Sequence, residues 1–130
     1  MAVLTQSRQV QVTIVSDDSL GAQSLSQAVS NCGNVSVSVV GQGSADLAKT
    51  GQADFFLLCP PAEFRVRDLH RICERLKQVS RRSVILLVAP PEQARRFGVG
   101  SLIDGIVVQP VNEATIRVTF EHFAHLGQFL

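Results

Sequence analysis

The 130 residues suffice for one domain, and an apolar fraction of 45% with a charged fraction of 18% excludes a disordered chain. Twelve Lys and Arg residues against eleven Asp and Glu residues give a net charge of +1, which predicts no nucleic acid bound by this domain itself and no membrane. No apolar run approaches the roughly 18 residues of a membrane span, and the N-terminus lacks a signal-peptide pattern, so we expect a cytoplasmic protein.

The first half of the chain contains three strand-like apolar runs. Val10–Val15 is rich in β-branched residues. A helix is expected next, and Asn31–Asn34 ends it because Gly and Asn accept the left-handed cap conformation. Val35–Val40 alternates Val with Ser, as an edge strand does, and a short helix with Ser44 as N-cap follows. The solidly apolar run Phe55–Leu58 is typical of a buried central strand. The apolar stripe of the first helix comprises Leu20, Leu25, Ala28, Val29 and Cys32.

The second half continues the alternation of helix and strand. Val84–Ala89 predicts a second buried strand, and Pro91 suits the first turn of a short helix that extends to Phe97. Ile103–Val108 supplies the fifth strand, and Asn112 is the expected N-cap of the last helix. The buried stripe of the helix before Val84 comprises Phe64, Leu69, Ile72, Cys73, Leu76 and Val79. The inner side of the last helix carries Ile116, Phe120 and Phe123.

This alternation predicts an α/β fold in which residues 1–130 form one domain. Right-handed crossovers place helices on both faces of a parallel sheet, so we expect a flavodoxin-like (βα)5 three-layer sandwich with strand order 2-1-3-4-5. A functional site in such a sheet lies at the carboxyl ends of the strands, here after residues 15, 58 and 89.

Four segments at these strand ends carry a resemblance: IVSDDSL (14–20), ADFFLLCPP (53–61), SVILLVAPP (83–91) and DGIVVQPVNEATI (104–116). Through them the chain resembles the CheY-like receiver domains of two-component response regulators over essentially its whole length. The resemblance implies a part in phosphorelay signal transduction or transcription regulation. It also implies a cis peptide bond between Gln109 and Pro110, because receivers commonly hold the corresponding bond cis.

A working receiver needs carboxylates that hold Mg²⁺, an Asp that attacks the phosphoryl group, a Thr or Ser, and a Lys. Only one acidic position of the family matches directly, although Asp18 is adjacent to it. One carboxylate is a poor site for a hard cation that requires several oxygen ligands. We therefore predict a pseudo-receiver that is not an enzyme and binds no metal or cofactor. The family positions, in chain order, fall on Ser16, Asp17, Cys59 (the phosphoacceptor), Val88, Ile106 and Gln109.

Other roles for the reactive side chains are open. Cys59 could serve as an atypical redox or phosphoryl switch, but Cys32, Cys59 and Cys73 form no CxxC pair, so we favour packed, free thiols. Asp17 and Asp18 could bind a metal weakly, although helix capping is the favoured interpretation. His122 and His125 lie three residues apart without a third ligand, which argues against zinc.

A basic stretch surrounds the third predicted helix. We favour a solvated surface over a docking surface for an acidic partner, because the net charge of the chain is close to zero and acidic residues are interspersed. The basic residues are Arg65, Arg67, Arg71, Arg75, Lys77, Arg81 and Arg82.

The expected partner is a protein or a second copy of the chain. Receivers usually signal through the surface made by their fourth helix, fifth strand and fifth helix, which spans about residues 92–130 here, and an apolar patch there predicts a homodimer. We expect the domain to be the N-terminal module of a longer regulator. GIVVQPVNEATI (105–116) also resembles the degenerate receivers of ANTAR-type antitermination proteins, in which case a segment after Leu130 would bind RNA. The interface residues are Val99, Leu102, Val118, Phe129 and Leu130.

Overall fold

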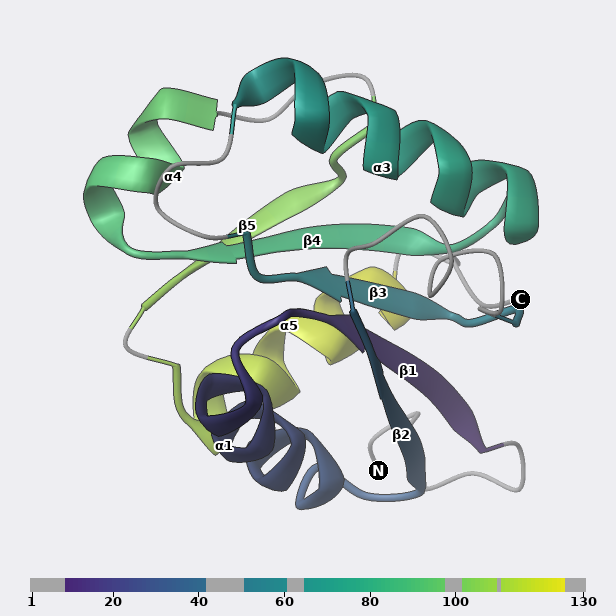
Figure 1. The fold of residues 1–130 in the computed structure, drawn as a ribbon. Helices are drawn as coiled ribbons and strands as arrows, with labels where there is room; N and C mark the ends of the chain where they lie inside the picture. Colours follow the sequence, from purple (N-terminus) through teal and green to yellow (C-terminus); the bar gives the residue numbers. More distant parts are fainter. Residues whose placement is uncertain (1–8, 42–50, 61–64, 98–101, 110, 126–130) are drawn as a thin grey trace.

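The computed structural model describes residues 9–41, 51–60, 65–97, 102–109 and 111–125 (Figure 1). Their strands form one parallel sheet in the order β2-β1-β3-β4-β5, as predicted. The predicted helix at Ser44 and the peptide bond at Pro110 lie outside the described residues, as do Phe64, Val99, Phe129 and Leu130. The strands are β1 (Val10–Val15), β2 (Val35–Val40), β3 (Phe55–Leu58), β4 (Val84–Ala89) and β5 (Gly105–Val108). The helices are α1 (Ser19–Ser30), α3 (Val66–Val79), α4 (Pro91–Phe97) and α5 (Glu113–His125).

Helices cover both faces of this sheet, α1 and α5 on one side and α3 and α4 on the other (Figure 1). Alternate residues of β3 serve the two layers: Phe55 packs with α1 and α5, whereas Phe56 packs with α3. Every residue of β3 and β4 is buried, which explains why their sequences are continuously apolar.

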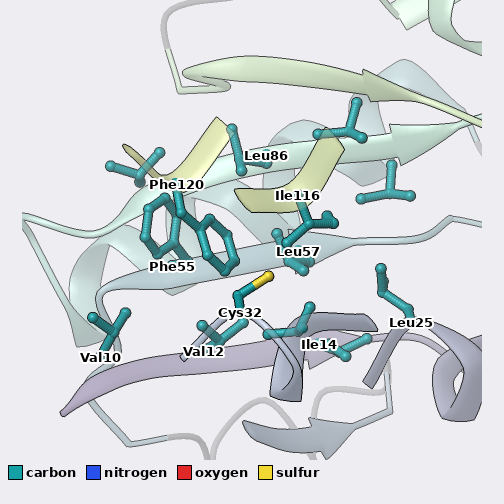
Figure 2. Packing of buried hydrophobic residues seen from close by; sticks show 14 of the residues in the cluster. Val10, Val12, Ile14, Leu25, Cys32, Phe55, Leu57, Leu86, Ile116 and Phe120 are labelled. Atoms are coloured by element: carbon teal, nitrogen blue, oxygen red, sulfur yellow. The ribbon is translucent and has the colours of Figure 1, made fainter. Parts of the chain in front are cut away.

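Aromatic rings anchor α5 on the sheet. Phe55 stacks on Phe120 with 4.2 Å between ring centroids, and Phe123 meets Phe55 edge-on at 6.4 Å. Figure 2 shows the Phe55 and Phe120 rings side by side, with Ile116 on the same helix above Leu57. Ile116 and Phe120 are fully buried and Phe123 is partly buried, so the predicted inner side of this helix is confirmed.

Two helix ends test the capping predictions. Asn112 Oδ1 accepts a hydrogen bond from Thr115 N–H at 2.9 Å, so it caps α5 as predicted. Asp18 occupies the N-cap position of α1, but its side chain makes no capping hydrogen bond. The prediction that its carboxylate caps the helix is therefore wrong. At the other end of α1, Gly33 has a φ of 131°, a conformation that favours glycine.

Leu20 and β5 differ from the sequence prediction. Leu20 is 76% exposed, although the apolar pattern predicts it in the buried stripe of α1. Leu20 precedes buried Leu25 by five positions, which is a rotation of about 140° around the helix, so it cannot share that stripe. The strand β5 begins at Gly105 instead of Ile103. The reason is that the carboxylate of Asp104 takes the next ladder hydrogen bond, from Ile85 N–H at 2.8 Å.

A second aspartate performs the same task two strands away. Gln11 N–H donates to Asp54 Oδ2 at 2.8 Å, and Asp54 N–H donates to the Gln11 carbonyl at 2.8 Å. Asp104 also accepts from Lys77 Nζ at 3.3 Å. Asp54 and Asp104 both directly precede a strand, so side-chain carboxylates extend the ladder at the amino ends of β3 and β5.

Candidate functional site

The register brings the predicted site positions to one edge of the sheet. Val15 pairs with Leu58 and Leu58 with Leu87, so Ser16, Cys59 and Val88 follow at the same level on β1, β3 and β4. On the neighbouring strand, Gln109 N–H donates to the Ala89 carbonyl at 2.9 Å. The residues that the resemblance assigns to the site therefore lie together at the carboxyl ends of the strands.

Ser16 takes part in local backbone structure. Its side chain is buried, and its hydroxyl oxygen accepts a hydrogen bond from Asp18 N–H at 3.1 Å. This contact fixes the turn that leads into α1, and Ala22 N–H then donates to the Asp18 carbonyl at 2.9 Å. Asp17 and Asp18 are exposed, and the Asp18 carboxylate lies over the first turn of the helix, 2.6 Å from where a Cβ on Gly21 would be.

Cys59 is half-buried and lies against the core layer formed with α1 and α5. Burial, and secondarily the negative charge of Asp18, raises the pKa of its thiol to about 12. At neutral pH the group is a protonated thiol, which is a weak nucleophile and a weak metal ligand.

The remaining positions offer no phosphate chemistry. Val88 is 2% exposed and belongs to the core, so a hydroxyl is replaced by a packed methyl group. Ile106 is half-buried against the layer formed with α3, and Gln109 is exposed. An amide in place of the family's lysine carries no positive charge with which to bind a phosphoryl oxygen.

The donor set does not fit the Mg²⁺ that receivers use. A hard cation requires several oxygen ligands, whereas a neutral thiol stands at position 59 and Ser16 already serves the backbone. Within the described ranges no three His, Cys, Asp or Glu side chains gather where they could hold a metal ion. No step of a metal-assisted reaction can be assigned to these residues.

The other candidate side chains lie elsewhere. Cys32 and Cys73 are buried, burial raises the pKa of each thiol, and that of Cys73 reaches about 12. All three cysteines are free thiols, as predicted. The His122 ring packs edge-on against Phe123 at 5.4 Å, and the side chain of His125 lies outside the described part of the chain.

Several exposed apolar side chains lie on the carboxyl side of the sheet, spread from β2 to β5. Leu20 and Val66 lie in the first turns of α1 and α3, and Val39 and Val108 lie near the ends of β2 and β5. Each follows or ends a strand on the carboxyl side of the sheet. A sequence signal existed for Leu20, which falls on the outer side of α1 by angle. None existed for Val66, which lies only about 20° around α3 from buried Cys73.

The predicted interface residues divide into two kinds. Val118 on α5 is 66% exposed, whereas Leu102 is partly buried against the core layer of α3 and is not free to bind a partner in full. Val108 on the edge strand β5 is 45% exposed.

The helices in the described ranges include none that is long and apolar enough to cross a membrane.

Known structures share this fold. The chain matches a protein described as a pilus assembly protein (CpaE) from Burkholderia thailandensis with a TM-score of 0.72 and 13% identity, covering 90% of this chain and 99% of that one. It matches a CheY-like response regulator receiver domain from Methylobacillus flagellatus with a TM-score of 0.68 and 15% identity, over 88% and 98% of the two chains. The chemotaxis protein CheY4 of Vibrio cholerae matches with a TM-score of 0.62 and 20% identity, over 88% and 98%.

No protein-family model and no curated protein matches the sequence. The structural matches show that the chain has the fold of CheY-like receiver domains. Because one fold hosts many functions, the function has to be inferred from the residues of the site.

Proposed function

We propose that the chain is a receiver-like domain that does not accept a phosphoryl group and acts through protein contacts, without enzymatic activity. The observation that carries this proposal is the state of position 59, where the resemblance expects the attacking carboxylate. A half-buried thiol with a pKa near 12 stands there instead, at the same level as buried Val88. The same pKa argues against the alternative of a switch based on a Cys59 thiolate.

Self-association is the contact that we propose first. Val118 presents an exposed apolar side chain on α5, and Val108 does so on the edge strand β5. A two-fold dimer would bury this surface twice, which is the commonest arrangement of soluble homo-oligomers. In this role the module would serve signal transduction or transcription regulation.

Sedimentation velocity at tens of micromolar tests the association. The wild-type chain should sediment as a dimer, and Val118→Glu should shift it to the monomer because a charge would be buried in the apolar contact. Gln23→Glu, which adds the same charge on an exposed position of α1, is the matched control and should remain dimeric. A wild-type monomer unaffected by Val118→Glu would refute association through this surface.

A second candidate function follows from the structural neighbours. Besides the Burkholderia thailandensis protein, a pilus assembly-related protein from Burkholderia pseudomallei matches with a TM-score of 0.65 and 14% identity, over 90% of each chain. These two neighbours favour a role as an interaction module in pilus assembly. Deleting the gene and counting surface pili tests it: an unchanged pilus number would exclude this role.

A further inference from the structure

The charge of this chain is distributed very unevenly. Residues 65–82, which comprise α3 and its flanks, contain seven basic and two acidic residues, a net charge of +5. The other 112 residues contain five basic and nine acidic residues, a net charge of −4. The overall value of +1 therefore conceals a strongly basic segment, so the net charge of the chain does not describe the charge of this surface.

The structure places three of these positive charges on the outer side of α3 and three more on the exposed segments that flank it. Leu69, Ile72 and Leu76 bury the inner side against the sheet. Arg67 and its counterparts at successive four-residue intervals are exposed, so their guanidinium groups form a row along the helix. Figure 1 shows α3 as an outer layer of the molecule, with one side against the sheet and the other away from it. The exposed arginines are Arg65, Arg67, Arg71, Arg75, Arg81 and Arg82.

Lys77 does not belong to this surface, contrary to the sequence prediction. Its ammonium group donates to the Ser83 carbonyl at 2.6 Å and to Asp104 at 3.3 Å, so it serves the fold. The exposed acid of the helix, Glu74, lies 3.4 Å from His70. Across the residues that the structure describes, no ion pair engages any of the six exposed arginines.

The kind of charge indicates the kind of partner. A guanidinium group binds a carboxylate through two parallel hydrogen bonds, which a lysine cannot do. Residues four apart on a helix lie about 6 Å apart, so the row of Arg67, Arg71 and Arg75 matches carboxylates spaced by four residues on a second helix. Glu74 within this surface and exposed Val66 at its beginning suit a mixed protein contact better than a uniform polyphosphate backbone.

We propose that the outer side of α3 binds an acidic helix of a partner protein through this row of arginines. The surface lies on the opposite side of the sheet from α5, so the inference does not depend on self-association through α5.

A synthetic helical peptide with three glutamates spaced by four residues is a direct probe, with fluorescence anisotropy of the labelled peptide as the measurement. The full chain should bind it, and the variant R67E/R71E/R75E should bind it at least about tenfold more weakly, since three exposed ion pairs turn into repulsions. R67K/R71K/R75K keeps the charge but loses the paired hydrogen bonds, and it should bind about threefold more weakly or worse.

Three controls make the result specific. Q23E adds negative charge on α1, on the far side of the sheet, and should leave peptide binding unchanged. A peptide with glutamine in place of glutamate should not bind, and circular dichroism should show that each variant is folded. Equal affinity of wild type and R67E/R71E/R75E would overturn the proposal. So would tighter binding of a double-stranded DNA or RNA of matched charge, because the surface would then be a nucleic-acid site.

Discussion

The two ends of the parallel sheet use their polar residues differently. At the amino ends of β3 and β5, Asp54 and Asp104 accept ladder hydrogen bonds, and Lys77 joins Asp104 to α3. At the carboxyl ends, where receivers carry their chemistry, the corresponding positions hold a neutral thiol and a buried valine. The polar side chains at the amino ends stabilise the fold. Among the residues that the structure describes, the carboxyl ends carry Cys59, Val88 and several exposed apolar side chains.

Removing Asp104 should produce the largest effect of this comparison. Asp104→Ala leaves Ile85 N–H, whose residue is fully buried, without its acceptor and deprives Lys77 of its partner. We expect a loss of about 2 kcal/mol in the free energy of unfolding, measured by urea denaturation. At the other end, Asp18→Ala should change it by less than about 0.5 kcal/mol. Similar losses for both variants would contradict the distinction between the two ends.

The cysteine at the carboxyl end should make stability fall at high pH. Burial raises the pKa of Cys59 to about 12 from the ordinary 9.0, so between these values the folded state binds more protons than the unfolded state. The thiol's contribution is complete below pH 9 and is lost as the pH rises toward 12. Cys59→Ala should remove a slope of about 1 kcal/mol per pH unit above pH 9. Urea denaturation at pH 8, 9 and 10 measures how the free energy of unfolding of each protein changes with pH. Identical slopes for the wild type and Cys59→Ala would show that the thiol is not desolvated.

Removing Asp54, which performs the same task as Asp104 at the amino end of β3, should destabilise the fold less. Asp54 accepts from Gln11 N–H, but Gln11 is exposed, so water can replace the lost acceptor. Asp54→Ala should therefore lower the free energy of unfolding by only about 0.5–1 kcal/mol in the same denaturation assay. An effect larger than that of Asp104→Ala would mean that burial of the donor does not determine the loss.

The sequence predicted the regular elements well where local chemistry determines them. The β-branched and apolar runs gave β1, β2, β3 and β4 with their observed ends, and Pro91 marked the start of α4. The predictions failed where a distant contact decides the outcome. Nothing local shows that Asp104 pairs with Ile85 and shortens β5, or that Lys77 reaches Ser83 and leaves the exposed basic surface.

The candidate site was predictable in its position but not in its physical state. The resemblance predicts that Ser16, Cys59 and Val88 lie together, and the strand register puts these three residues at one level of the sheet. The raised pKa of Cys59 depends on burial of the thiol and on the charge of Asp18, which comes near Cys59 only in the folded chain. The exposed apolar residues at the same edge likewise depend on which side of each helix meets the sheet.

Intact-mass spectrometry after incubation with acetyl phosphate and Mg²⁺ tests the central claim most directly. A receiver domain with the full set of acidic, hydroxyl and lysine residues serves as the positive control and should gain a phosphoryl group. This chain should keep its unmodified mass, because position 59 carries a neutral thiol and positions 88 and 109 carry valine and glutamine. A phosphoryl adduct at stoichiometric yield, on Cys59 or on Asp17, would contradict the account.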